Sequence, residues 1–245
     1  YLIFTILSIT TLYLKIPKIL KNLKKDRKIE KKLVLSEFLK YGFISMVGTV
    51  ASTGTGYISV LVIGVYLSSS QAGIYSLVIT IVSILMFIPK LAKQVLLPEF
   101  SKLFGENNKK DISILLRDSL KILVCLAFII CFLVFFFSDQ ILLFFGSDFK
   151  AGSLLLRLML PSVFIRIIST PFVSFLSGTN FIIYPNIGGL IILFISILLW
   201  IILVPSFELI GIVIGYTAGV LIGIGYQIYM AIYKLKIEFP SFLNV

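Results

Sequence analysis

The sequence predicts an all-α fold: a polytopic helical membrane protein in which a six-helix lobe follows the truncated last helix of a preceding lobe. The 245 residues are 59% hydrophobic and only 13% charged, whereas about a quarter of the residues of a soluble domain are charged. The complete apolar runs are about 18–27 residues long, which matches the roughly 20 residues that a helix needs to cross the hydrocarbon. Runs of this length are too long for barrel strands, so we expect helices.

Seven membrane segments are expected in order along the chain. Residues 1–14 lie inside an apolar run and form the end of a helix that belongs to a preceding lobe. Residues 15–40 form a basic linker, which is either an amphipathic helix at the membrane surface or a solvated spacer. The six-helix lobe occupies residues 41–233, a half-helix lies at residues 139–150, and residues 234–245 form a tail. The six complete segments are 41–67, 74–97, 120–137, 153–177, 181–204 and 209–233.

The distribution of basic residues predicts the orientation in the membrane. Of the 22 Lys and Arg residues, ten lie in 15–40, seven in 90–121 and two in the tail. The alternate loops, which together hold only one basic residue, are 68–73, 138–152 and 205–208. Because basic loops stay in the cytoplasm, we expect the protein to span the cytoplasmic membrane with loops 15–40 and 98–119 and the tail on the cytoplasmic side. The alternate loops are expected outside. The same rule accounts for the net charge of +11 without a nucleic-acid partner.

Several kinds of chemistry lack the residues that they need. The chain has no His, which excludes a histidine base and a Ser-His-Asp set. Cys125 and Cys131 lie six residues apart in one apolar run, so they indicate no zinc site. No Asp or Glu falls within the core of a predicted segment, where a proton or sodium relay would place one. We therefore expect no catalytic residue, no metal and no cofactor.

Two successive segments carry a polar face. Hydroxyl-bearing and small residues recur at intervals of three and four in segments 41–67 and 74–97, so they share one side of each helix. Such a face either lines a hydrated cavity or packs tightly, with hydroxyls bonding to their own backbone. We favour the cavity because two helices share the pattern and one continues to Lys90. The candidate cavity-lining residues are Ser45, Thr49, Ser52, Ser59, Ser76, Thr80, Ser83 and Gln94.

Arg166 lies near the middle of segment 153–177, between Pro161 and Pro171. A cation at this depth costs about 2.5–3.5 kcal/mol on insertion scales, so it should face a cavity or a partner. The guanidinium fork suits a phosphate. Arg166 and Lys90 are therefore the candidate binding residues for an anionic substrate. The alternative for Arg166 is snorkelling, or a structural bond to a carbonyl that a proline leaves free.

The last segment carries glycines at strict four-residue intervals. Small residues at this spacing let another helix approach closely. We expect this stripe to pack against a neighbouring helix. The four residues are Gly211, Gly215, Gly219 and Gly223.

The run from Gly56 to Tyr75 resembles the polysaccharide and lipid-linked oligosaccharide flippases of the multidrug/oligosaccharidyl-lipid/polysaccharide (MOP) exporter superfamily, O-antigen flippases among them. Lobes of these proteins open with a helix that ends in Ile-Gly-x-x-Leu, here Ile63–Leu67, followed by a short loop and Gly-Ile-Tyr. The next helix ends in Pro-x-Phe-Ser, here Pro98–Ser101. An outer Leu-Phe-Gly half-helix, Leu142–Phe149, and the glycine-rich last helix also fit.

This resemblance implies that residues 36–235 are the C-terminal lobe of a two-lobe transporter, with the N-terminal lobe as its partner. It implies a transporter and not an enzyme. The substrate would be a polyprenyl-pyrophosphate-linked oligosaccharide, a polysaccharide precursor that crosses the cytoplasmic membrane by alternating access. Its sugar and pyrophosphate would pass through a hydrated cavity while the lipid stays in the bilayer. Many relatives have an acid where this chain has Ser59, so ion coupling is not expected there.

Other functions remain open from the sequence. A multidrug or cation-antiport exporter of the same superfamily would require an intramembrane acid elsewhere in the full protein and an aromatic cavity. A membrane glycosyltransferase or sugar polymerase would require sizeable outer loops, whereas residues 138–152 form the longest one here. A non-transporting scaffold is a third possibility, which the absence of any substrate-dependent phenotype would favour.

Overall fold

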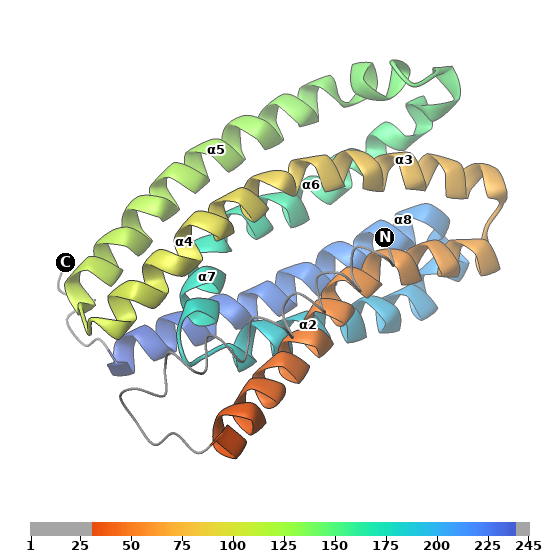
Figure 1. The fold of residues 1–245 in the computed structure, drawn as a ribbon. Helices are drawn as coiled ribbons and strands as arrows, with labels where there is room; N and C mark the ends of the chain where they lie inside the picture. The colour runs from red at the N-terminus through yellow and green to blue at the C-terminus, as the bar shows by residue number, and fades with distance from the viewer. Residues whose placement is uncertain (1–30, 239–245) are drawn as a thin grey trace, which may run out of the picture. The chain divides into compact units, whose positions relative to one another are not determined.

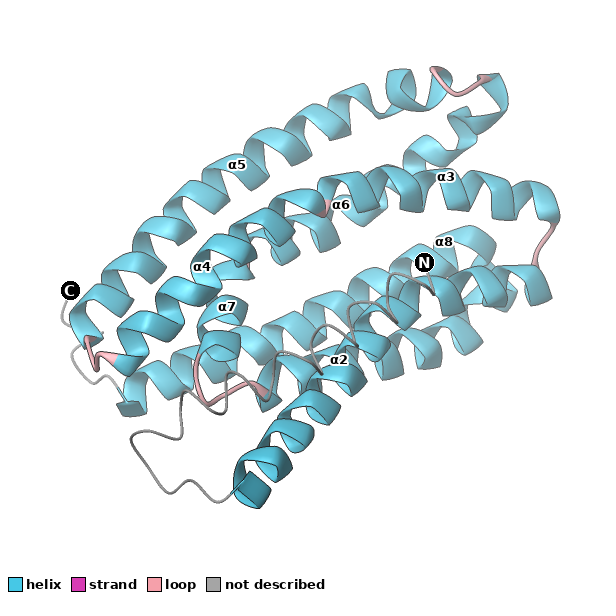
Figure 2. Ribbon diagram, viewed as in Figure 1, coloured by secondary structure: helices cyan, strands magenta, loops and turns pink. Residues whose placement is uncertain are grey.

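The computed structural model describes residues 31–238, in which every regular element is a helix and the turns between helices are short (Figure 2). The predicted segment 1–14 and the tail from residue 239 onward lie outside the described residues. The elements are α2 (Lys31–Tyr66), α3 (Ser69–Leu85), α4 (Phe87–Gly105), α5 (Lys109–Leu143), the 3-10 helix η1 (Ser147–Gly152), α6 (Ser153–Ile168), α7 (Thr170–Gly178) and α8 (Ile183–Glu238). The expected all-α fold is confirmed. The chain divides into two units, residues 1–43 and 44–245, and the following account concerns the second unit.

Four of the described stretches are long and apolar enough to cross a membrane. They are Ser69–Gly105, Lys109–Leu143, Ser147–Ile168 and Ile183–Leu235, and Gly54–Tyr66 is a shorter apolar stretch. The stretch in α8 comprises two helices, because Glu208 has φ 48° and ψ −128° and so cannot continue a helix. We call residues 183–207 and 209–238 the first and second arms of α8.

The helices extend well beyond the apolar runs that predicted them. The expected loop 98–119 is wrong in extent, because only residues 106–108 separate α4 from α5. Charged residues are compatible with a helix once it leaves the hydrocarbon, and the Asn108 side chain caps α5 by accepting from the Asp111 N–H at 3.2 Å. The expected loop 68–73 is likewise mostly helix, because Ser68 and Gln71 form a capping box that starts α3.

The expected half-helix at 139–150 is also wrong in its bounds. Its first residues continue α5 to Leu143, and only Ser147–Gly152 forms a separate short helix. Two predicted segments are each divided into two helices, at Met86 between α3 and α4 and at Ser169 between α6 and α7. Each break lies within three residues of a proline, Pro89 or Pro171. A proline lacks the N–H that a continuous helix would donate four residues back.

The core of the unit is built around α6 and α7. Helix α6 packs against α5 and α8, and α7 packs against α4 and α8. Fully buried side chains in this core include Met159, Phe100, Phe175 and Trp200. The Phe100 and Phe175 rings meet edge to face with centroids 5.9 Å apart, which joins α4 to α7.

The turns of the bundle gather at two ends (Figure 1). One end holds the turns at residues 66–69, at 143–147 and at Glu208, where Gln71 Nε2 donates to Glu208 Oε2 at 2.6 Å. We call it the Glu208 end. The other, the Asn107 end, holds the turns at 105–109 and 178–183. The alternation agrees with the loop pattern read from the charges, while the side of the membrane on which each end lies stays a prediction.

Candidate functional site

A polar face runs along α3 and α4 on the surface of the unit. Ser76, Thr80, Ser83, Lys90 and Gln94 are all exposed in the structure. The Thr80 hydroxyl donates to the Ser76 carbonyl at 2.8 Å, and the Ser83 hydroxyl donates to the Thr80 carbonyl at 2.7 Å. These bonds use the hydroxyl hydrogens and leave the oxygens free to accept from a ligand or water. We name these five residues the polar stripe.

Lys90 is the cation of the polar stripe. It lies 21 residues after the start of α3 at Ser69, so it is about 31 Å along the helix toward the Asn107 end at 1.5 Å per residue. Within the described residues, the ion pairs are Arg117–Asp118 and Arg157–Asp139, and neither includes Lys90. Its ammonium is therefore available to a ligand.

Ser59, predicted to line the cavity from α2, has no exposed surface in the structure. Its hydroxyl donates to the Gly56 carbonyl at 2.6 Å and accepts a hydrogen bond from the Tyr75 hydroxyl at 3.0 Å. A buried phenol needs such an acceptor, and this pairing joins α2 to α3. Ser45 of α2 is half-buried, while the side chains of Thr49 and Ser52 lie outside the described residues.

Arg166 lies in the last turn of α6 and is half-buried. Its guanidinium carbon is 5.7 Å from the centroid of the Tyr216 ring on the second arm of α8, a cation–π arrangement. Its buried Nε has no hydrogen-bond partner among the described residues. The Arg166 carbonyl accepts from the Ser169 and Thr170 hydroxyls, both at 3.0 Å. The guanidinium therefore retains donor capacity for an anion.

Two tyrosines hold two of the candidate residues. The Tyr75 hydroxyl donates to Ser59, and the Tyr216 ring lies beneath the guanidinium of Arg166. Sequence analysis missed both tyrosines as site residues. The available signal was a phenol inside an apolar segment, which needs a polar partner when buried.

The four spaced glycines of α8 face its first arm. A Cβ added at Gly215 would lie 2.6 Å from the Trp200 ring, at Gly219 2.8 Å from the Ile192 carbonyl oxygen, and at Gly223 2.6 Å from the Gly188 carbonyl oxygen. A Cβ at Gly211 would lie 2.6 Å from the Leu203 carbonyl oxygen. These distances leave no room for a side chain between the two arms.

Two polar side chains hold the arms of α8 together at either end of the hairpin. Trp200 Nε1 donates to the Ile212 carbonyl at 2.9 Å, near the turn, and Gln227 Nε2 donates to the Pro185 carbonyl at 2.9 Å, near the open end. The arms therefore form one tightly packed hairpin, and Tyr216 projects from it toward Arg166.

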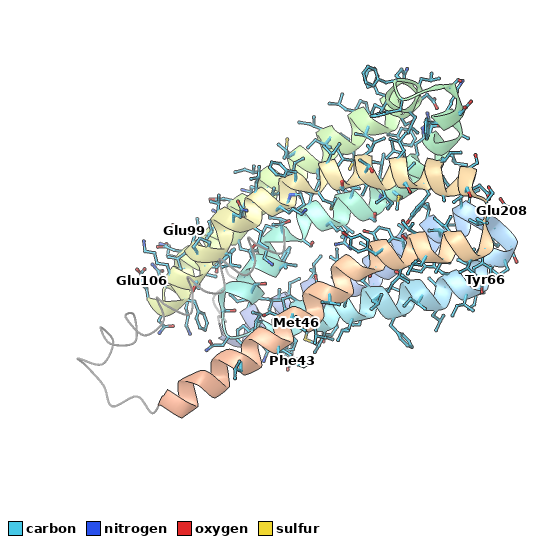
Figure 3. The ribbon with its side chains drawn as sticks, turned by 45° about the vertical axis from the view of Figure 1, so that its right-hand side comes forward. Phe43, Met46, Tyr66, Glu99, Glu106 and Glu208 are labelled. Atoms are coloured by element: carbon cyan, nitrogen blue, oxygen red, sulfur yellow. The ribbon has the colours of Figure 1, made fainter. Side chains whose placement is uncertain are left out.

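The carboxylates of the described spans lie toward their ends. Figure 3 shows Glu99 and Glu106 toward one end of the unit and Glu208 at the opposite end. Among residues 31–238, no salt bridge involves Arg166, and no group of three or more His, Cys, Asp or Glu side chains could hold a metal ion. Within this range, the interior of the site is cationic and hydroxylated.

Comparison with known proteins adds two findings and one absence. The MatE family model matches residues 45–206. Over 216 residues, the chain is 24% identical to the probable low-salt glycan biosynthesis flippase Agl15 of Haloferax volcanii. The aligned region covers 86% of this chain and 44% of that protein. The chain thus spans less than half the length of this relative. No solved structure matches the chain.

Proposed function

Because this chain belongs to the MatE family, we propose that it forms one lobe of an exporter that moves a polyprenyl-pyrophosphate-linked oligosaccharide across the cytoplasmic membrane. MatE proteins are membrane transporters, and the similarity to a protein named as a glycan biosynthesis flippase supports the substrate class. A second lobe of the same protein would complete the path, and rocking of the lobes would give alternating access.

The observation that carries the proposal is the state of Arg166. A guanidinium inside a membrane protein is costly unless it has a partner, yet this one has a ring beneath it and a buried Nε without an acceptor. A pyrophosphate supplies several anionic oxygens, and the guanidinium fork can bind two of them at once. We therefore assign Arg166 to the pyrophosphate, with Tyr216 holding the guanidinium in place.

The polar stripe has a different role in this proposal. Its exposed oxygens and amide would replace water around the sugar hydroxyls as these pass through the membrane. Lys90 lies toward the Asn107 end, which the positive-inside rule places in the cytoplasm. It would attract the pyrophosphate at entry, where water can substitute for it, so its contribution should be smaller than that of Arg166.

The test is export by variants of the full-length protein, read as accumulation of the lipid-linked sugar on the inner leaflet. We expect Arg166→Ala to abolish export while insertion and stability stay near those of the wild type. Arg166→Lys should keep part of the activity, because the charge survives but the two-pronged geometry does not. Lys90→Ala should be milder than Arg166→Ala.

Arg117→Ala is the matched control, because Arg117 is exposed and paired with the adjacent Asp118. It should export normally. Full export by Arg166→Ala would reject the substrate role of Arg166, and loss of folded protein in that variant would favour a structural role. If the wild type exports a cationic dye and leaves lipid-linked sugars untouched, the protein is a multidrug exporter of the same superfamily.

A further inference from the structure

An apolar groove of about 460 Å³ lies between α5, α6 and the second arm of α8. Four phenylalanines dominate its walls, and Pro161 and Leu221 contribute from α6 and α8. The phenylalanines are Phe128, Phe132, Phe135 and Phe164. None of the lining residues belongs to α3 or α4, which carry the polar stripe. The groove is therefore separate from the polar stripe.

The groove opens onto the outer surface of α5. Phe128, Phe132 and Phe135 occupy successive turns and are 62%, 51% and 48% exposed. In a membrane, this face meets hydrocarbon, so a lipid chain can enter sideways without any opening of the helices. Along α5 the three rings span about 10 Å at 1.5 Å per residue. These walls suit a hydrocarbon chain and offer a sugar almost no polar contact.

One polar residue, Arg157, marks the end of the groove nearer the Glu208 end. Its Nε donates to Ser138 Oγ at 2.6 Å and to the Phe135 carbonyl at 3.3 Å, and its Nη2 donates to Asp139 at 2.7 Å. Its guanidinium carbon lies 5.6 Å from the centroid of the Phe135 ring. These contacts leave Nη1 without a hydrogen bond among the described residues.

The guanidinium of Arg157 is the hydrogen-bond donor at this end of the groove. Its Nη2 forms a salt bridge with Asp139 Oδ2 at 2.7 Å, and its side chain stays 31% exposed. Asp148 and Lys150 follow in η1, one acid and one base. Asp139 lies four residues before the end of α5 at Leu143, where a spanning helix reaches the level of the lipid headgroups. A phosphate at that level would accept a hydrogen bond from Nη1 of Arg157, which the contacts described above leave unused.

We propose that the groove binds a glycerophospholipid of the surrounding bilayer, with one acyl chain along the phenylalanines and the phosphate accepting from Arg157. The guanidinium fork suits a phosphate, and the headgroup and chain of one lipid match the charged end and the apolar walls in order. This site does not depend on the sugar path, so either proposal can fail while the other stands.

The test is native mass spectrometry of the full-length protein after extraction and washing in detergent. Leu221→Trp places a large ring at the wall of the groove. Ile222→Trp is the matched control, because Ile222 is the next residue on the same arm and similarly exposed, at 52% against 44% for Leu221, but does not line the groove. We expect the wild type and Ile222→Trp to retain one phospholipid, and Leu221→Trp to retain at least fivefold less.

Headgroup recognition is tested by competition. A phospholipid should displace the bound lipid at least fivefold more effectively than a diacylglycerol with the same chains, and Arg157→Gln should remove that difference while Arg157→Lys keeps part of it. Melting temperatures establish that each variant folds, and Leu221→Phe replaces Leu221→Trp if the latter does not.

Equal retention by the Leu221 and Ile222 variants would overturn the assignment. If diacylglycerol displaces the bound lipid as effectively as the phospholipid does, the proposed contact between Arg157 and the phosphate is wrong. If a polyprenyl phosphate displaces the bound lipid at lower concentration than any phospholipid does, the groove belongs to the transported lipid and not to the bilayer.

Discussion

The α3–α4 span and α5 both expose a long face, and the two faces have opposite chemistry. The polar stripe of α3 and α4 brings three hydroxyls, an amide and an ammonium to the surface. Residues 122–137 of α5 contain no charged, amide or hydroxyl side chain, and most of the exposed residues there are large and apolar. Lipid accepts the second kind of surface and penalises the first. The contrast supports our proposal that the polar stripe lines a hydrated path while α5 faces the bilayer.

The largest expected effect comes from placing the same charge on each face. Ile129→Lys puts an ammonium on the exposed face of α5, where a midplane cation costs about 2.5–3.5 kcal/mol. Ser83→Lys puts it on the polar stripe, where water can solvate it. We expect the yield of membrane-inserted, monodisperse protein to collapse for Ile129→Lys and to stay near that of the wild type for Ser83→Lys. Equal yields would break the comparison.

A third kind of surface, buried between two helices, sharpens the distinction. Gly219 faces the first arm of α8, and a Cβ there already lies 2.8 Å from a carbonyl oxygen, whereas Gly225 has nothing within 4 Å. Gly219→Leu should therefore cause loss of folded protein in detergent, measured by size-exclusion yield and melting temperature. Gly225→Leu, on the same arm, should fold normally. Wild-type behaviour of the Gly219 variant would mean that the two arms do not pack as described.

Water access gives a smaller but more direct comparison of the two faces. Single cysteines replace Thr80 on the polar stripe and Leu133 on α5, after Cys125 and Cys131 have been replaced. A membrane-impermeant thiol reagent needs water and the thiolate. We expect the cysteine at position 80 to label at least tenfold faster in the full-length protein. Labelling of the cysteine at position 133 at the same rate would place water on both faces.

How far the sequence predicts this structure depends on which physical constraint sets each feature. Apolar runs locate the spans, because every backbone polar group in the hydrocarbon must be paired within the helix. They do not locate the helix ends, because polar caps such as Ser68 and Asn108 set these outside the hydrocarbon. The breaks at Met86 and Ser169 could have been predicted from the nearby prolines.

The candidate site was harder to predict because it depends on how each helix is rotated. The polar stripe of α3 and α4 has the exposed positions that its periodicity indicates. The same periodicity on α2 assigns Ser59 to a cavity, yet contact with Tyr75 buries it. Similarly, the sequence shows that Arg166 lies near the middle of an apolar segment. Its contact with Tyr216 joins residues 50 positions apart and exists only once α8 packs against α6.

The smallest expected effect concerns the Tyr75–Ser59 hydrogen bond, where the order of the variants is the informative result. Tyr75→Phe removes the donor and leaves Ser59 bonded to the Gly56 carbonyl, so the loss should be about 0.5–1.5 kcal/mol. Ser59→Ala leaves the fully buried Tyr75 hydroxyl without its acceptor, which costs about 1–3 kcal/mol. Thr80→Val on the exposed stripe should change the free energy of unfolding by less than either.

Unfolding in detergent micelles measures all three, and the double variant Ser59→Ala/Tyr75→Phe should lose less than the sum of the two single losses, because each removes the same bond. A greater loss for Thr80→Val than for Ser59→Ala would mean that the hydroxyl on the polar stripe is the buried one. In that case the hydroxyl face of α2 would be the exposed, hydrated one, and the polar stripe of α3 would be buried.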